Sequence, residues 1–150
     1  MKEVLKIGFV GTAISPYYAE EQEVRKNSEF QLKKILENFD VELISFHKTI
    51  FSKEDSIEAE NLLKNKVDFL LIQTSSCSSG EQLYPLCNIS SKIGVWAVPD
   101  IEKEGGVKLH SLVSTSHYLG IIKKTLSDRK IKTKWFYNYA DTEEFKNKFL

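Results

Sequence analysis

The sequence has no long apolar run, few cysteines and no excess of either charge, and each absence excludes a class of protein. Among 150 residues, 21 Lys and Arg balance 21 Asp and Glu, so the formal net charge is zero. That balance provides no basic surface for nucleic acid and no polybasic anchor for a membrane. No apolar stretch reaches the roughly 20 residues that cross a bilayer. We therefore expect a single domain over residues 1–150 with neither a nucleic-acid nor a membrane partner.

Only two cysteines occur, Cys77 and Cys87, and they lack the CxxC spacing of a metal or redox site. Such sparse use of cysteine is typical of a reducing compartment. The N-terminal sequence MKEVLKIGFVG lacks the cleavage site of a signal peptide and is interpreted as leading into a first strand. We therefore expect a cytoplasmic protein with two free thiols.

Short apolar runs alternate with amphipathic stretches along the chain. The runs predict strands at Leu5–Val10, Val41–Phe46, Val67–Gln73, Ile93–Val98 and Lys132–Tyr137. The stretches between and after them predict helices at Glu20–Asn38, Asp55–Lys64, Gly80–Ser91, Ser116–Ser127 and Thr142–Phe149. This alternation indicates βαβ crossovers and a parallel sheet. It favours a three-layer flavodoxin-like α/β domain with five strands in the order 2-1-3-4-5, an order chosen because it is common in such folds.

In such a sheet, ligands bind beyond the carboxyl ends of the strands, where the strand order reverses. The loops expected there are residues 11–18, 74–80, 98–106 and 109–117. The last of them, Leu109–His117 (LHSLVSTSH), is the best candidate for contacting a ligand, because its hydroxyl groups lead to a lone histidine just before an apolar helix. The alternative for His117 is a structural hydrogen bond at the helix start.

The other loops carry weaker signals. The first lacks both the third glycine of a dinucleotide-binding loop and the GKS or GKT of a phosphate loop. Tyr17 and Tyr18 in it either stack on a ligand or pack against the first helix. Ser76, in the loop TSSCSSG, either contacts a ligand or serves as an ordinary loop or capping residue. Arg25, in the first helix, is expected to form a surface ion pair rather than a ligand contact.

Three longer segments carry a family resemblance. They are KIGFVGTAISPYY, VDFLLIQTSSCSSGEQLYPLCNISSKIGVWAVP and LHSLVSTSHYLGIIKKTLSDRKIKTKWFYNYAD. In order and spacing they resemble the N-terminal domain of the L-fucose and L-arabinose isomerase superfamily. The third resembles a family segment with an Asn-Gln-x-x-His pattern. His117 falls on that histidine, while Val113 and Ser114 stand where the family has the two amides.

The resemblance implies a domain that lends contacts to the sugar site of an aldose–ketose isomerase and helps it to oligomerise. His117, Ser114, Tyr17 and Tyr18 are then the substrate-binding candidates, joined by Ser76 from the hydroxyl-rich loop. It also implies Mn²⁺ held by carboxylates and a histidine of later domains. The three histidines here form no HxH or HExxH pattern, so we expect no metal, cofactor or catalytic residue within residues 1–150. A homo-oligomer or a partner catalytic domain would complete the site and make it an isomerase.

A second function stays open, that of a stand-alone small-molecule-binding or regulatory module without catalysis. A receiver domain has paired acids after its first strand and a phosphorylatable Asp after its third, but here those positions are GTA and TSSC. Phosphotransfer is therefore disfavoured. A flavin site is also weakly supported, because the hydroxyl-rich loop follows the third strand rather than the first.

Overall fold

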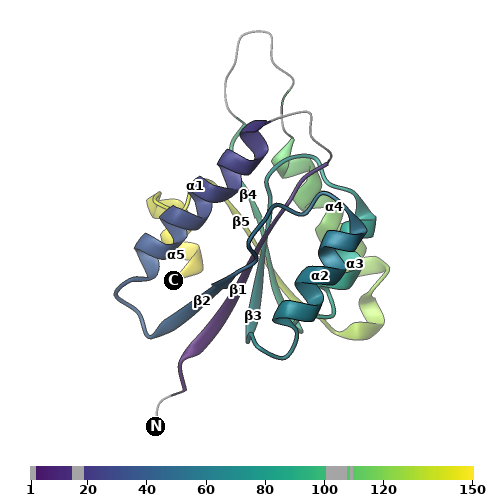
Figure 1. The fold of residues 1–150 in the computed structure, drawn as a ribbon, viewed down its shortest axis with the longest axis horizontal. Helices are drawn as coiled ribbons and strands as arrows, with labels where there is room; N and C mark the ends of the chain where they lie inside the picture. Colours follow the sequence, from purple (N-terminus) through teal and green to yellow (C-terminus); the bar gives the residue numbers. More distant parts are fainter. Residues whose placement is uncertain (1–2, 15–18, 101–107, 109) are drawn as a thin grey trace.

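The computed structural model describes residues 3–14, 19–100, 108 and 110–150, with residues 19–22 described by their backbone alone. Its strands are β1 (Leu5–Thr12), β2 (Val41–Ser45), β3 (Phe69–Thr74), β4 (Lys92–Ala97) and β5 (Lys132–Tyr137). They form one parallel sheet in the order β2-β1-β3-β4-β5 (Figure 1). The predicted flavodoxin-like class and strand order are confirmed.

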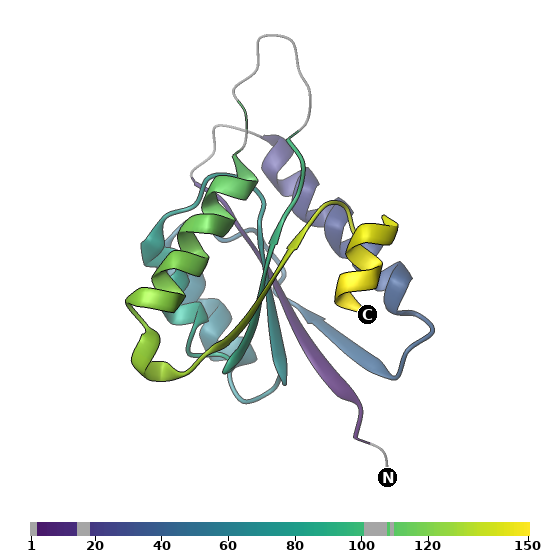
Figure 2. The ribbon, with the colours of Figure 1, turned by 180° about the vertical axis from the view of Figure 1, so that it is seen from behind.

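The helices form two layers around this sheet. They are α1 (Ala19–Leu36), α2 (Lys53–Leu63), α3 (Gly80–Leu86), α4 (Ser111–Lys124) and α5 (Glu143–Phe149), with a 3₁₀ turn, η1, at Ser127–Arg129. α1 and α5 cover one face, and α2, α3 and α4 cover the other (Figure 1, Figure 2). Among the described helices, none combines the length and apolar character needed to cross a bilayer.

The central strand β3 is almost wholly apolar because helices cover both faces of the sheet at its position. Leu70 and Ile72 are fully buried in the core beneath α2, α3 and α4, whereas Leu71 is fully buried beneath α1 and α5. Successive strand side chains point to opposite faces. The continuous apolar run of β3 therefore contributes side chains to the hydrophobic cores on both faces of the sheet.

Aromatic rings dominate the core beneath α1 and α5. Trp96 is fully buried there, with its ring centroid 4.8 Å from that of Phe145 and 6.2 Å from that of Phe9. Its indole Nε1 donates a hydrogen bond of 2.7 Å to the carbonyl of Asn138. This bond satisfies the one polar atom of the indole side chain and joins β4 to the segment that leads into α5.

The prediction for α4 was wrong at its start. The helix begins at Ser111, five residues before the predicted start at Ser116. Serine and threonine are typical of loops and caps, so a hydroxyl-rich stretch favoured a loop. In the structure, the buried hydroxyls of the first turns bond to neighbouring segments, and tertiary contacts override the local preference. His117 consequently lies in the second turn of α4 and not at the mouth of the helix.

The third helix is also shorter than predicted, because α3 ends at Leu86 rather than Ser91. The next residues turn tightly instead. The amide of Asn88 bonds to the carbonyl of Pro85 at 3.1 Å, and that of Ile89 bonds to Leu86 at 3.1 Å. These i to i−3 bonds end the helix and bring the chain back to the start of β4.

The two edges of the sheet are β2 and β5. β5 exposes most of its length, and Trp135 on it is 46% exposed. The ammonium group of Lys148, in α5, lies 3.9 Å from the centre of the Trp135 ring. Lys132 and Lys134 are also exposed on this strand. β5 therefore presents charge along the outer edge of the sheet, where no further described strand pairs with it.

Two glycines are expected to respond to alanine in opposite ways. A Cβ at Gly94 would lie 2.6 Å from Phe69 Cζ and 2.8 Å from Phe136 Cε2. Gly94→Ala should lower the free energy of unfolding by about 1–3 kcal/mol, because both rings must move. Gly120 in α4 has nothing within 4 Å of that position. Gly120→Ala should raise the free energy by about 0.5–1 kcal/mol through helix propensity.

Urea denaturation of both variants measures the two changes. A Gly94→Ala protein as stable as the wild type would contradict the packing described for β4.

Candidate functional site

The strand order reverses between β1 and β3. β1 leads into α1 on one face, and β3 leads into α3 on the other, so the chain diverges at their carboxyl ends. The ladder between them runs to its end, with Thr12 opposite Thr74. Ligands of open α/β sheets bind at such a point. The candidate site is therefore built from the segments that follow β1, β3 and β4.

Thr74, the last residue of β3, is the centre of a buried hydrogen-bond cluster. Its Oγ1 donates to the carbonyl of Ser111 at 2.8 Å and lies 2.8 Å from Thr115 Oγ1. Ser111 Oγ in turn donates to the carbonyl of Thr74 and accepts from the amide of Val98 at 2.9 Å. Thr74, Ser111 and Thr115 are all at most 1% exposed. The bonds fasten the first turns of α4 to the ends of β3 and β4.

The segment after β3 is fastened in the same way. Ser114 Oγ accepts a hydrogen bond of 2.8 Å from the amide of Ser78, and Ser78 Oγ lies 2.9 Å from Thr12 Oγ1. Ser114 and Ser78 are buried, with 2% and 6% exposure. A chain of hydroxyls thus crosses from α4, through the loop, to the end of β1. We call these six residues the hydroxyl network: Thr12, Thr74, Ser78, Ser111, Ser114 and Thr115.

Gln82 and Tyr118 close the network from the side of α3. Gln82 Nε2 donates to the carbonyl of Ala13 at 2.8 Å, and its Oε1 accepts from the amide of Ser79 at 3.1 Å. The Tyr118 hydroxyl donates to the carbonyl of Ser79 at 3.2 Å. Burial raises the pKa of Tyr118 to about 12. The phenol therefore stays protonated and acts as a donor at neutral pH.

A buried ion pair lies on the opposite side of β1. Arg25 in α1 is 5% exposed, and its Nη1 lies 2.9 Å from Glu29 Oε2, while Lys33 Nζ lies 2.6 Å from the other oxygen. Burial disfavours the Glu29 carboxylate, but the Lys33 hydrogen bond and the charges of Lys33 and Arg25 outweigh it and hold the pKa of Glu29 below its ordinary value. The predicted pairing of Arg25 is therefore present, but it is buried rather than on the surface.

The stem of Arg25 packs flat on the end of β1 because Gly11 has no side chain. A Cβ at Gly11 would lie 2.6 Å from Arg25 Cγ. The guanidinium also donates to the carbonyl of Phe46 at 3.4 Å, while its Nε is buried without a hydrogen-bond partner among the described residues. Arg25 thus joins α1 to the ends of β1 and β2.

His117 is exposed, unlike the hydroxyl network. It lies beside Gly80, the first residue of α3, where an added Cβ would be 3.4 Å from the His117 Nε2 atom. Its ring centroid is 6.5 Å from that of Tyr118, which belongs to the buried layer beneath it. The imidazole therefore lies in the second turn of α4, beside the start of α3, on an exposed residue.

The other predicted contacts are placed differently. Ser114 and Ser76 are both 2% exposed; Ser114 accepts from the Ser78 amide, and Ser76 Oγ donates to the carbonyl of Cys77 at 3.1 Å. Both hydroxyls are therefore engaged within the chain. Tyr17 and Tyr18 lie outside the described residues. The ligand-binding role assigned to these residues stays a prediction.

The described residues contain no group of three or more His, Cys, Asp or Glu side chains placed to hold a metal ion. The carboxylate after β4, that of Asp100, accepts a hydrogen bond of 2.9 Å from the amide of His110. His110 has a left-handed backbone, with φ of 57°. The bond anchors the residue that leads into α4. Asp100 therefore has a structural partner.

The chain matches no model of a known protein family and no curated protein sequence.

The structural importance of Thr74 and Gln82 was not predicted from the sequence. Both lie in stretches whose visible pattern is apolar periodicity or a run of hydroxyl-bearing residues. A threonine that ends a buried strand, followed by a polar loop, is a signal for such a cluster, because a buried hydroxyl needs a partner. The identity of the partner depends on which loops meet, and that is a property of the folded chain.

Thr74→Val should lower the free energy of unfolding by about 1–3 kcal/mol. The substitution keeps the shape but leaves buried partners of the hydroxyl unsatisfied. Thr133→Val is the matched control, because Thr133 is exposed on the edge strand β5, and its effect should stay within about 0.5 kcal/mol. Denaturation in urea, followed by circular dichroism, compares the two. Equal stabilities would show that the network does not hold the carboxyl edge together.

The two cysteines are free thiols, as expected, and they should differ in reactivity. Cys87 is 5% exposed, and burial raises its pKa from 9.0 to about 12, whereas Cys77 is partly exposed. A thiol reagent at pH 8 should therefore modify Cys77 in the native protein and Cys87 only after unfolding. Because the unfolded thiol ionises first, Cys87 should also make the folded state less stable as the pH rises above 9.

Mass spectrometry of the labelled protein counts and locates the modified thiols. Native labelling of both cysteines at equal rates would contradict the burial of Cys87.

Proposed function

We propose that the carboxyl edge of this sheet contributes to a binding site for a small polyhydroxylated ligand, of the sugar class that the family resemblance implies. The observation that carries the proposal is the position of His117. Its imidazole is exposed beside the start of α3, next to the point where the strand order reverses. A neutral imidazole offers one donor and one acceptor, which suits a pair of sugar hydroxyls.

The hydroxyl network supports this role indirectly. Its members bond to one another and to the backbone, so a ligand would have to break those bonds to reach them. We infer that the network fixes the loop after β3 and the first turns of α4, and thereby fixes the position of His117. Groups held by packing and hydrogen bonds recognise a ligand at a lower entropic cost.

The chain supplies binding and positioning in this proposal, and the chemistry of isomerisation is assigned to a partner catalytic domain or subunit. In the resembled family, a divalent cation polarises the sugar while acid and base groups move a proton. The proposal assigns neither polarisation of the sugar nor proton transfer to a residue of this chain. The same reasoning covers the alternative, a binding module without catalysis, because the contact made by His117 would be the same.

Titration of L-arabinose and L-fucose into isotopically labelled protein tests the site. Because the site is only partial, we expect millimolar binding, with amide shifts concentrated at Gly80 and in the first two turns of α4. His117→Ala should weaken binding by roughly fivefold, the value of about one hydrogen bond. His47→Ala is the control. His47 is also exposed, but it follows β2, and its Nε2 lies 3.6 Å from Glu58 Oε1.

Nuclear magnetic resonance measures both the amide chemical-shift changes and the affinity for each sugar. Unchanged affinity in His117→Ala, or no shifts with either sugar at high concentration, would overturn the proposal.

A further inference from the structure

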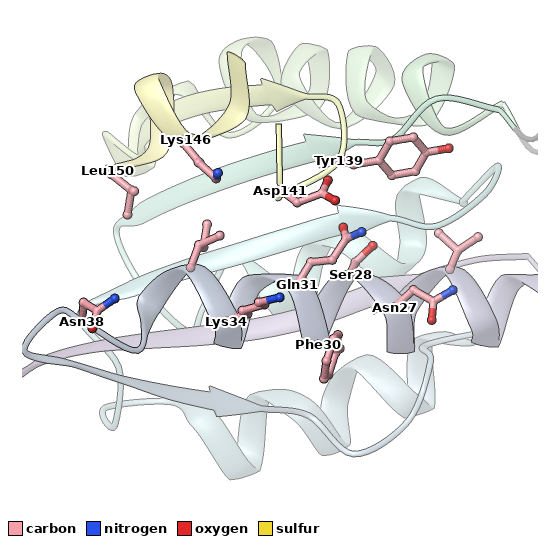
Figure 3. Close-up of a pocket in the computed structure, with 12 residues that line it drawn as sticks. Asn27, Ser28, Phe30, Gln31, Lys34, Asn38, Tyr139, Asp141, Lys146 and Leu150 are labelled. Atoms are coloured by element: carbon pink, nitrogen blue, oxygen red, sulfur yellow. The ribbon is translucent and has the colours of Figure 1, made fainter. Parts of the chain in front are cut away.

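A groove of about 660 Å³ lies on the face of the sheet that carries α1 and α5, away from the candidate sugar site. One wall is α1, and the other is formed by α5 and by the segment that joins it to β5 (Figure 3). The side chains of Gln31 and Lys34 line the α1 wall, and Asp141 lies on the opposite one. Nothing in the proposed function uses this surface.

The groove carries opposite charges on its two walls. Lys34 and Asp141 are both exposed, and within the part of the chain that the structure describes neither side chain makes a hydrogen bond or an ion pair. A second lysine at the groove, Lys146, is already paired with Glu143 at 3.2 Å. An unpaired cation and an unpaired anion therefore face the same hollow from different sides.

The α1 wall also has a buried polar atom without a hydrogen-bond partner among the described residues, and an exposed aromatic ring. Gln31 Oε1 is buried without a hydrogen-bond partner among the described residues. A buried acceptor without a donor is costly, so a turn of the Gln31 side chain that brings Oε1 to a donor at the groove would be favoured. Phe30, the residue before Gln31 in α1, is 69% exposed and also lines the groove. Such a large exposed ring is a common anchor of protein interfaces.

These features fit a second copy of the same chain. In a twofold dimer each surface meets itself, so that residue i contacts residue j and j contacts i. A cation on one wall and an anion on the other then form two equivalent pairs, Lys34 to Asp141 and Asp141 to Lys34. An amide such as Gln31 is likewise self-complementary, because it both donates and accepts. The zero net charge of the chain adds no long-range repulsion between copies.

We propose that two copies of this chain associate face to face across the groove between α1 and α5, with Lys34 of each copy paired to Asp141 of the other. α1 has 18 residues and is about 27 Å long, and a standard interface needs about 800 Å² from each partner. The proposal does not rest on the sugar site, which lies at the carboxyl edge of the sheet.

Charge reversal provides the test. Analytical ultracentrifugation of the wild type at about 100 μM, well above a micromolar dissociation constant, should show twice the chain mass of 17.2 kDa. Lys34→Asp and Asp141→Lys should each be monomeric, because each sets like charges against one another twice. An equimolar mixture of the two variants should form a heterodimer, since both pairs then have opposite charges. The double variant should also dimerise.

Two further variants make the result specific. Lys123→Asp, at an exposed lysine of α4 on the other face of the sheet, should leave the dimer unchanged. Phe30→Ser should give a monomer without altering any charge. Circular dichroism confirms that each variant is folded. A monomeric wild type, single reversals that remain dimers, or a mixture that stays monomeric would each overturn the proposal, whatever the sugar titrations show.

Discussion

The hydroxyl of Thr74 is the contact on which the arrangement of the carboxyl edge depends. It ends the central strand, donates to the backbone at the start of α4 and lies against Thr115 one turn further along that helix. The Ser111 hydroxyl in turn donates to the Thr74 carbonyl and accepts a hydrogen bond from the amide of Val98, the first residue after β4. Buried polar groups need hydrogen-bond partners. These bonds can form only when α4 holds a single position relative to β3 and β4. The same hydrogen bonds therefore also fix the positions of the loop after β3 and of the exposed His117.

The class of the fold was predictable because apolar periodicity reports burial directly, whereas the strand order was expected only because it is common among such folds. The run around Leu70, Leu71 and Ile72 needs cover on both faces, which only a central strand of a parallel sheet provides. The start of α4 was not predictable in the same way. Ser111 and Ser114 have the local preferences of loop residues, and their helical state depends on partners in β3 and the following loop. Long-range hydrogen bonds decided the outcome there.

The candidate site was only partly predictable, for a related reason. A hydroxyl-rich segment at a strand end predicts polar chemistry, but it does not tell whether the partner is a ligand or the protein itself. The structure assigns the hydroxyls of Ser76 and Ser114 to internal partners and leaves the His117 imidazole exposed. The edge thus separates into a buried layer of hydrogen-bonded hydroxyls and an exposed histidine. Arg25 belongs to the first kind, although its charge alone favoured the surface.

The exposed lysines on β5 have a consequence for how copies of this chain can meet. An unpaired parallel strand is a template onto which another strand can add, and uncontrolled addition leads to open-ended sheets. Lys132 and Lys134 would bring like charges together if two β5 edges approached, and the Lys148 ammonium covers the ring of Trp135, the most exposed of the three aromatic rings on that strand. Backbone-to-backbone growth is therefore blocked at this edge. The dimer proposed across the groove between α1 and α5 would use side-chain surfaces instead, and its twofold symmetry would limit the assembly to two copies.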